Sequence, residues 1–316
     1  MRPQSRPFSP ASRTAPRSRR SRAGAVLVFA LFAVAALVSI ATIASVAARG
    51  RAARAASRIG RATLRDEAHE ALAAALWSIE IDTNAVDSLS EEWAIASGAA
   101  AEALQSGRDG VFTVVSDECA RLGLPECGEN ALAALFAAAN PGLDGVAASG
   151  LARDAFLRLG ACATNLPCEE ALVALFQEDD PARRDAVAVA LPFLSAVSGK
   201  RFNANTAPRE VVLAAALGGG ATRGGAEGLW LRLEMARGRG DVLESTDPQE
   251  ALKLAIGAGD MPTAEEIAAL AAIESLVLVD SGLFRVRSTA RRGGRSATVE
   301  CVYERATGRI YRWVER

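Results

Sequence analysis

Residues 23–48 read AGAVLVFALFAVAALVSIATIASVAA, a run that contains no charge and no proline and lies between two arginines. At about 1.5 Å of rise per residue, a helix of this length crosses a bilayer core of about 30 Å. The run therefore predicts a transmembrane anchor at residues 25–48, preceded by a basic leader at residues 1–24. The alternative is a cleaved secretory signal with small residues at 45–47, but the apolar part of such a signal is normally about 7 to 15 residues long.

Helical spacing continues beyond the anchor. Arginines recur at alternate intervals of three and four residues, which places them on one face of a helix: Arg51, Arg54, Arg58, Arg61 and Arg65. An apolar stripe of helical period follows at Leu64, Ala68, Leu72, Leu76 and Ile79. We therefore expect the anchor and a stalk at residues 49–81 to form one helix that ends near Ile81.

The C-terminal part of the chain has the pattern of a sheet. Period-two alternation, typical of strands, appears between Phe284 and Trp313, and a further strand is expected at residues 111–115. Gly293-Gly294 and Thr307-Gly308 stand where two hairpin turns are needed. A three-stranded meander is marginal alone, so we expect it to pack on the outer half of the stalk helix.

The predicted fold class is α+β. Half of the residues are hydrophobic but only 5% are aromatic, so most of the chain should form helices with small side chains. We expect a long N-terminal helix packed on a small antiparallel sheet, with a large helical insertion. The sheet region comprises residues 82–115 and 276–316, and the inserted helical domain comprises residues 116–275.

Two pairs of cysteines each enclose a short loop, and each loop leads into a helix of similar sequence. The pairs are Cys119 with Cys127 and Cys162 with Cys168. Four cysteines can instead bind zinc, but neither pair has the usual spacing and no histidine lies nearby. We expect two local disulfides, which form in an oxidising compartment such as the periplasm. Cys301, in a strand-like run, is expected to be a buried free thiol.

Residues suited to catalysis are scarce. His69 is the only histidine and lies in the stalk, so Ser-His or Cys-His catalysis and histidine metal sites have little material. Gly199-Lys200 lacks both the earlier glycine and the following Ser or Thr of a phosphate loop. We therefore expect no catalytic residue and no enzyme activity, and an anchored hydrolase is the weakest interpretation.

Acidic residues cluster at Asp117-Glu118, Glu169-Glu170 and residues 178–180. Carboxylate oxygens are ligands that Ca²⁺ prefers, although none of these clusters matches an EF-hand loop. Charges in solvated turns and at helix N-termini also account for such clusters. The sequence requires no cofactor and leaves calcium open, so no metal ligand is assigned.

The clearest local motif is the Asn-Ala-Asn-Thr-Ala-Pro sequence at residues 203–208. Thr206 is placed as the N-cap of a helix, with Pro208 in its first turn. Asn203 and Asn205 favour the bent backbone that leads into it. The motif therefore predicts a structural turn into a helix.

Four segments together carry a resemblance to a known family: Arg22 to Ala25, residues 87–93, the motif at 203–208, and the closing strands at Phe284 and Trp313. With these, the chain resembles the minor pseudopilins of type II secretion systems, and among them the family of general secretion pathway protein K. The resemblance implies a pilin-like fold with a large helical insertion, and calcium binding in that insertion. It also implies that a prepilin peptidase cuts between Gly24 and Ala25. The chain departs from the family in its long, Arg-rich leader and in residues 117–124.

The resemblance also implies a place in an assembly. Most pseudopilins carry Glu at the fifth mature position, whereas the fifth residue counted from Ala25 is Phe29. A carboxylate in the membrane is costly without a partner subunit, so its absence suits a subunit with nothing above it. The implied protein is a tip subunit with a structural role in protein export across the outer membrane. Its implied partners are other minor pseudopilins, the prepilin peptidase and membrane lipid, without nucleic acid. It would lie in the inner membrane as a single-pass protein, with the N-terminus cytoplasmic and the C-terminal domain periplasmic.

A membrane-anchored DNA-binding protein is the alternative. Residues 203–212, followed by the Gly-rich run at 218–225, also resemble the helix-hairpin-helix modules of DNA-uptake proteins. Such modules need hairpin amides that meet phosphate and a basic face. The basic face would come from Arg223, Arg232, Arg237 and Arg239.

Overall fold

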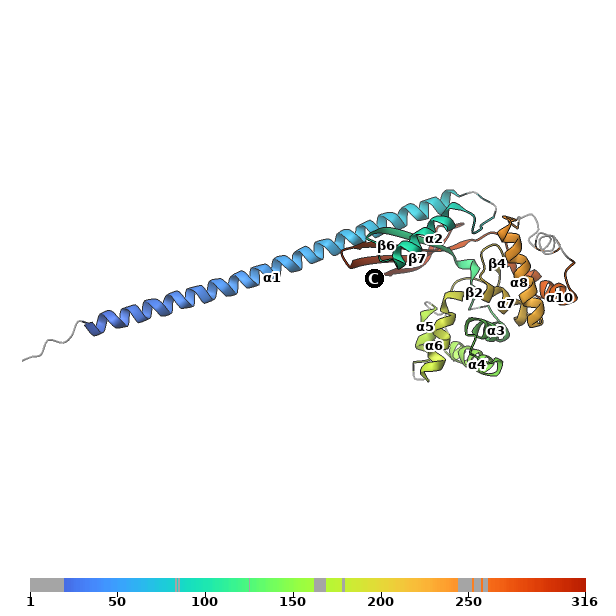
Figure 1. Cartoon of the computed structure of the whole chain (residues 1–316), viewed down its shortest axis with the longest axis horizontal. Helices are drawn as coiled ribbons and strands as arrows, with labels where there is room; N and C mark the ends of the chain where they lie inside the picture. The colour runs from blue at the N-terminus through green and yellow to red at the C-terminus, as the bar shows by residue number, and fades with distance from the viewer. Residues whose placement is uncertain are drawn as a thin grey trace, which may run out of the picture. The chain divides into compact units, whose positions relative to one another are not determined.

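The computed structural model describes residues 20–82, 84, 86–124, 126–161, 169–177, 180–243, 252, 257 and 261–316. The chain forms two compact units, residues 1–60 and residues 61–316. Helix α1 (Arg20–Ile81) begins in the first unit and ends in the second (Figure 1). The single long helix therefore ends at the residue that the apolar stripe predicted.

In its described residues, the first unit consists of the N-terminal part of α1. This helix is long and apolar enough to cross a membrane, and its large apolar side chains from Val26 to Val46 are all exposed. Two of its polar side chains are satisfied within the helix, because Ser39 Oγ and Thr42 Oγ1 each donate to a carbonyl four residues earlier at 2.8 Å. A long helix that exposes apolar side chains and satisfies its backbone groups internally suits a single-pass membrane anchor.

The second unit contains a four-stranded antiparallel sheet in the order β1-β6-β7-β8. Its strands are β1 (Gly110–Asp117), β6 (Leu283–Arg292), β7 (Arg295–Glu304) and β8 (Arg309–Glu315). The two hairpin turns contain Gly293, Gly294 and Gly308 at φ values of 57°, 75° and 69°, a conformation that glycine adopts without strain. The predicted α+β class, with a long N-terminal helix and a small antiparallel sheet, is confirmed.

The last turns of α1 cover one face of this sheet. Leu64, Ala68, Leu72 and Ile79 of α1 are buried against strand residues such as Val286. Helix α2 (Glu92–Gln105), which the sequence analysis did not predict, lies along the edge strand β1. Its side chains Ser97 and Trp93 attach it to the sheet. Ser97 Oγ accepts from Val115 N at 2.7 Å, and Trp93 meets Phe284 edge-on with 5.7 Å between ring centroids.

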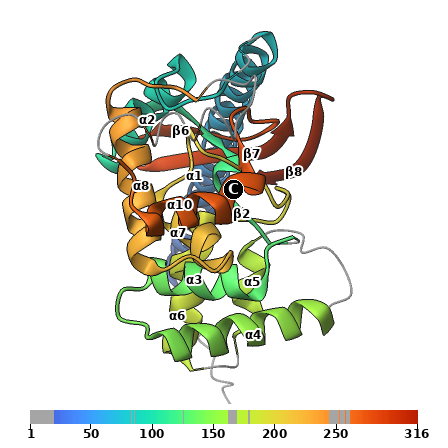
Figure 2. The ribbon, with the colours of Figure 1, turned by 90° about the vertical axis from the view of Figure 1, so that its right-hand side faces the viewer.

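The chain between β1 and β6 forms the inserted helical block. Its longer helices are α3 (Glu129–Ala139), α4 (Gly145–Ala161), α6 (Pro181–Ala190), α7 (Arg209–Gly218), α8 (Arg223–Gly238) and α10 (Ala264–Ile273). One core lies among α3, α4 and α6, and a second among α7, α8 and α10. In Figure 2, α4 lies at the end of this block away from the sheet strands.

Several short elements connect the block to the sheet. They are the 3-10 helix η1 (Glu118–Ala120), the helix α5 (Glu170–Ala174) and two parallel strand pairs. The pairs are β2 (Leu122–Gly123) with β3 (Leu194–Ser195), and β4 (Phe202–Asn203) with β5 (Val277–Leu278). Strand β4 places the start of the Asn-x-Asn-Thr-Ala-Pro motif beside the chain that enters β6.

Candidate functional site

Three segments that the sequence analysis singled out meet at one buried polar junction. Asn203, in β4, lies at its centre. Its side-chain amide donates to Asp87 O at 3.0 Å, to Asp117 Oδ2 at 3.1 Å and to Ser281 Oγ at 2.9 Å. All four residues are buried. Asn203 therefore joins the loop after α1, the end of β1 and the approach to β6, which are far apart in the sequence.

Asp117 is a carboxylate of this junction whose described donors are neutral. Its Oδ2 accepts hydrogen bonds from Asn203, Thr206 and Ser281, and its Oδ1 accepts from Cys119 N at 2.7 Å. Burial raises the pKa of Asp117 to about 6, although these hydrogen bonds oppose the shift. The site therefore contains a carboxyl group whose pKa lies well above its ordinary value.

The predicted N-cap role of Thr206 is wrong. Helix α7 begins at Arg209, and Pro208 occupies the N-cap position without a side-chain hydrogen bond. The physical reason is that the Thr206 hydroxyl is already used, since it donates to Asp117. The motif turns the chain toward the helix, but its threonine side chain binds Asp117 in the junction.

The remaining polar groups of the motif are held by the inserted block. Asn205 Oδ1 accepts from Leu243 N at 3.0 Å, and its amide donates to Leu243 O at 3.2 Å. The Arg237 guanidinium donates to Ala204 O and lies over the Trp230 ring at 5.1 Å. Burial lowers the pKa of Arg237 to about 10. Residues 203–205 are thus fixed by both the sheet side and the helical side.

An ion pair closes the junction on the side of α1. Arg305 donates from Nη1 to Asp87 Oδ1 at 3.0 Å and from Nη2 to Asp87 Oδ2 at 2.8 Å. Its guanidinium also lies over the Phe284 ring, 5.3 Å from the centroid. Burial raises the pKa of Asp87, while the bonds from Ser281 N and Arg305 lower it.

A second buried cluster, made of ion pairs, lies on the other face of the sheet. Arg285 donates to both oxygens of Glu118 at 2.8 Å and pairs with Glu169 and Glu300. Arg312 pairs with Glu169 at 3.3 Å. Burial would raise the pKa of Glu118, but Arg285 and Arg121 hold it below its usual value. The cluster ties η1 and the start of α5 to strands β6, β7 and β8.

These contacts account for most of the acidic pairs that the sequence suggested for calcium. Asp117, Glu118 and Glu169 are bound by side chains of the same chain, and Asp180 accepts from Ala182 N as the N-cap of α6. Residues 178 and 179 lie outside the described residues. In the described part of the chain, these carboxylates form contacts that stabilise the fold. Calcium binding remains a prediction without assigned ligands.

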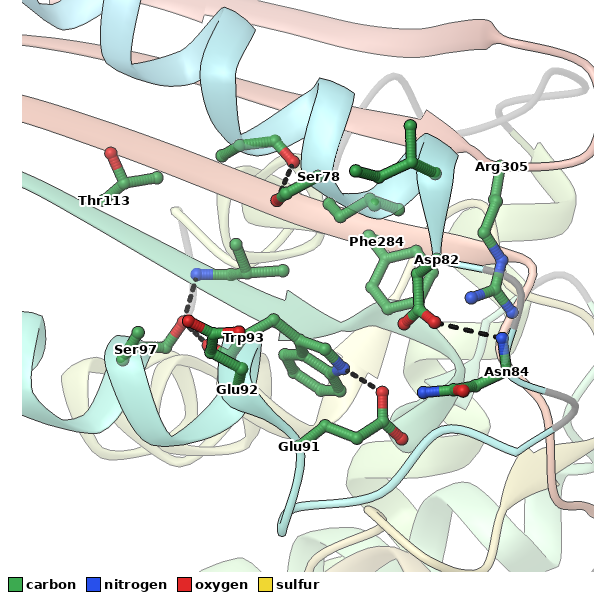
Figure 3. A pocket seen from close by; sticks show the side chains of 15 residues that line it. Ser78, Asp82, Asn84, Glu91, Glu92, Trp93, Ser97, Thr113, Phe284 and Arg305 are labelled. Atoms are coloured by element: carbon green, nitrogen blue, oxygen red, sulfur yellow. Dashed lines mark hydrogen bonds between the residues drawn. The ribbon is translucent and has the colours of Figure 1, made fainter.

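A groove of about 550 Å³ opens beside the junction (Figure 3). The last turns of α1 and the first turns of α2 form its walls, and strands β1 and β6 form its floor. Val115, Trp93 and Phe284 supply apolar and aromatic surface. Asp82, Glu91 and Glu92 supply carboxylates around it. Asp82, Glu91 and the nearby Asp87 have ligand atoms within 4.8 Å of one another, but Arg305 already binds both oxygens of Asp87.

The predicted processing and assembly positions lie in the first unit. Gly24, Ala25 and Phe29 are exposed on α1, and Phe29 is 76% exposed. Among the residues that the structure describes, a Cβ placed on Gly24 would meet nothing within 4 Å. Cleavage after Gly24 stays a prediction.

The cysteines differ from the expected disulfide pattern where they are described. Cys119 and Cys127 are free buried thiols, so the structure does not contain the disulfide predicted between them. Cys119 faces the backbone of residues 282–283, whereas Cys127 packs in the core of α3, α4 and α6. Burial raises the pKa of both thiols to about 12. Cys301 is a buried free thiol, as predicted, and Cys162 and Cys168 lie outside the described residues.

The proposed DNA-binding surface is largely engaged by the chain itself. Arg232 pairs with Glu266 at 3.1 Å, Arg239 with Asp241 at 2.8 Å, and Arg237 binds the motif backbone. The Gly-rich run serves helix packing, because a Cβ on Gly218 would lie 2.7 Å from Ala131 Cβ. This arrangement does not favour hairpin amides that face a phosphate.

Comparisons with known proteins show a likeness in structure. No model of a protein family matches the sequence, and no curated protein is similar to it. Among solved structures, the chain is similar to a chain of "The Crystal Structure of the GspK-GspI-GspJ complex from enterotoxigenic Escherichia coli Type 2 Secretion System". The TM-score is 0.51 at 13% identity, over 84% of this chain and 97% of that chain. The two chains therefore share a fold.

Proposed function

We propose that this protein is a minor pseudopilin of a type II secretion system and that it occupies the tip of the pseudopilus. The observation that carries the proposal is the fold shared with a chain of the GspK-GspI-GspJ complex, which extends over 97% of that chain. Because 84% of this chain is covered, the similarity also extends to most of the helical block between β1 and β6. The role is structural, in protein export across the outer membrane.

The tip position is supported by the anchor sequence. With Ala25 as the first mature residue, position five is Phe29, an apolar side chain that presents no carboxylate to a subunit above. A charged group at this depth would need a partner to offset its cost in the membrane. A subunit that lacks the group has no need of a neighbour on that side, while its helix still offers a lateral surface to subunits below.

The first experiment concerns processing. The full chain is produced with a prepilin peptidase, and the mature N-terminus is determined by mass spectrometry. We expect a methylated chain that begins at Ala25. Gly24→Val is the control variant, since a side chain there meets no neighbour, and it should insert in the membrane with its leader intact. A wild-type chain that begins at Arg2 or at Ala48 would contradict the proposal.

The second experiment concerns assembly. The full chain is isolated in mild detergent together with the other minor pseudopilins of the same system, which should copurify with it. Phe29→Glu should assemble or show a mild defect, whereas Leu37→Asp should abolish insertion and assembly because it places a charge within the apolar run. If no pseudopilin copurifies and the chain instead binds DNA in a salt-sensitive way, the DNA-binding alternative replaces this proposal.

A further inference from the structure

The groove between α1 and α2 combines an aromatic floor with an acidic rim. Trp93 and Phe284 line it together with Asp82, Glu91 and Glu92 (Figure 3). Its volume of about 550 Å³ lies in the range of about 300 to 1,000 Å³ that is typical of ligand pockets. The mixture of charge and aromatic surface is the feature that needs an explanation.

At one end of the groove, an arginine of the same chain already binds an aromatic ring and a carboxylate together. Arg305 lies over the Phe284 ring at 5.3 Å and donates two hydrogen bonds to Asp87. A cation that stacks on an aromatic face while a carboxylate binds its N–H groups gains from both interactions. Phe284 and Asp87 are therefore already occupied by an arginine of the same chain.

Among the described residues, the carboxylates around the neighbouring Trp93 ring lack such a partner, although Arg305, which binds Asp87, also lines the groove. Glu91 accepts from Trp93 Nε1 at 2.8 Å and from Ser88 N at 2.6 Å, which are neutral donors. Asp82 accepts from Asn84 N at 3.0 Å, and Glu92 is exposed at the first turn of α2. Within the residues that the structure describes, none of these three carboxylates forms an ion pair. Burial raises the pKa of Glu91, and Asp87 and Asp82 add to that shift, so an approaching cation would stabilise its ionised form.

We propose that this groove binds a segment of a partner polypeptide that presents a lysine or arginine flanked by apolar side chains. The cation would lie against Trp93 between Glu91 and Glu92, repeating the arrangement of Arg305 on Phe284. The apolar neighbours would cover Ile81 of α1 and Ala96 of α2, which line the groove and are exposed. The choice of partner rests on the proposed function, in which it is another pseudopilin.

Site-specific photocrosslinking in cells tests the proposal with the full chain. Ala96, which lines the groove on α2, is replaced by a photoreactive phenylalanine, and crosslinked peptides are identified by mass spectrometry. The expected product joins Ala96 to a pseudopilin segment with Arg or Lys within about four residues. The same probe at Val146, which is 85% exposed on α4, should not give this product.

Substitutions of the acidic residues around the groove test whether the crosslink depends on charge. Glu92→Gln combined with Asp82→Asn should lower the crosslink yield about threefold or more, and Glu92→Lys should lower it further, because a like charge opposes the guest cation. Glu129→Gln, in the first turn of α3, removes an exposed acid elsewhere and should leave the yield unchanged. The inference would be overturned by crosslinks only to lipid, or by crosslinks to a segment without a cation. It would also be overturned if the yield did not change when the acidic residues are substituted.

The outcomes separate this inference from the proposed function. If pseudopilins copurify with the chain but Ala96 does not crosslink to them, the function stands and the groove inference fails. If no pseudopilin copurifies, the function fails. A charge-dependent crosslink to a cationic segment of a different protein would then still support the groove.

Discussion

Asp117 and Glu118 are adjacent in the sequence and both are buried, yet their pKa values move in opposite directions. The pKa of Asp117 is raised to about 6, whereas that of Glu118 is lowered. Burial acts on both in the same sense, since it disfavours the charged form. The difference comes from the partners. Asp117 is bound by hydroxyl and amide groups, and Glu118 is bound by the Arg285 guanidinium.

The two clusters therefore fasten the inserted block to the sheet by different means. On the side of α1, a hydrogen-bonded network around Asn203 joins three segments. On the opposite face, ion pairs around Arg285 join η1 and α5 to the strands. Neutral donors leave part of the cost of a buried charge in place, whereas arginines compensate it through charge as well as hydrogen bonds. The clusters should consequently respond differently to substitution and to pH.

The largest effect is expected from Arg285→Leu. Removal of one partner from a buried ion-pair cluster typically costs about 3 to 5 kcal/mol of stability. Here, among the described residues, it leaves Glu118 and Glu169 with only the longer pairs to Arg121 and Arg312. Urea unfolding of the purified chain, followed by circular dichroism, measures the loss. Arg287→Leu is the matched control two residues along the same strand. Arg287 is half exposed in its pair with Glu300, so it should cost about 1 kcal/mol or less. Equal losses for both variants would contradict the distinction between buried and exposed pairs.

The elements that the sequence could predict depend on local periodicity. The apolar run and the stripe from Leu64 to Ile79 predicted α1 and the face that packs on the sheet. The alternation between Phe284 and Trp313 predicted the meander, and the glycines predicted its turns. Helix α2 escaped detection because Ala and Gly dominate residues 94–101 and separate no apolar face from a polar one. The strand pairs of two residues are too short to have a period.

The polar clusters could not be predicted because their partners are distant in sequence. The pattern around Thr206 is typical of a helix N-cap, but its hydroxyl is bound by Asp117, 89 residues away. The acidic pairs resembled solvated turns or calcium ligands because their arginines come from strands much later in the chain. Asp87 and Asn203 both belong to segments that carry the family resemblance, yet nothing in either segment indicates that they meet. The groove likewise exists only once α2 lies beside β1.

The next effect concerns pH and is expected to reach about 3 kcal/mol. The pKa of Asp117 is raised in the folded state from 3.8 to about 6, so the folded state retains a proton that the unfolded state releases. The contribution to stability is fully present below about pH 4 and is lost as the pH rises to about 6. At about 1.4 kcal/mol per pKa unit, the loss is about 3 kcal/mol. The raised pKa of Asp87 adds a slope of the same sign.

Urea unfolding at a series of pH values between 4 and 7 measures this slope. Asp117→Asn removes the titrating group, so the profile should flatten across the window whatever the change in absolute stability. Glu118 provides the contrast, because its lowered pKa contributes stability at higher pH that is lost on acidification. If the wild-type and Asp117→Asn profiles run parallel, Asp117 does not titrate as described.

Asn203→Ala should cost about 2 to 3 kcal/mol. The substitution removes the hydrogen bonds to Asp87 O, Asp117 and Ser281, and it leaves buried acceptors unsatisfied. Asn130→Ala, on the exposed first turn of α3, is the matched control and should lie within about 0.5 kcal/mol of the wild type. A loss for Asn203→Ala no larger than that of the control would show that the motif does not hold the junction.

The smallest effect distinguishes the two roles that a threonine can have here. Thr206→Val keeps the shape of the side chain but removes the hydroxyl that binds Asp117, so it should cost about 1 kcal/mol. With one donor fewer, the pKa of Asp117 should rise further, and the stability loss should shift to higher pH. Thr206→Ser retains the hydroxyl and should restore the wild-type profile.

Thr222 provides the comparison, because it is an N-cap that accepts from Gly225 N at 3.1 Å. Thr222→Val should cost a similar amount, about 1 kcal/mol, without shifting the Asp117 profile, since the Thr222 hydroxyl binds Gly225 N and Glu265 and does not contact Asp117. A pH-independent loss at Thr206 would return it to the helix-capping role that its sequence suggests.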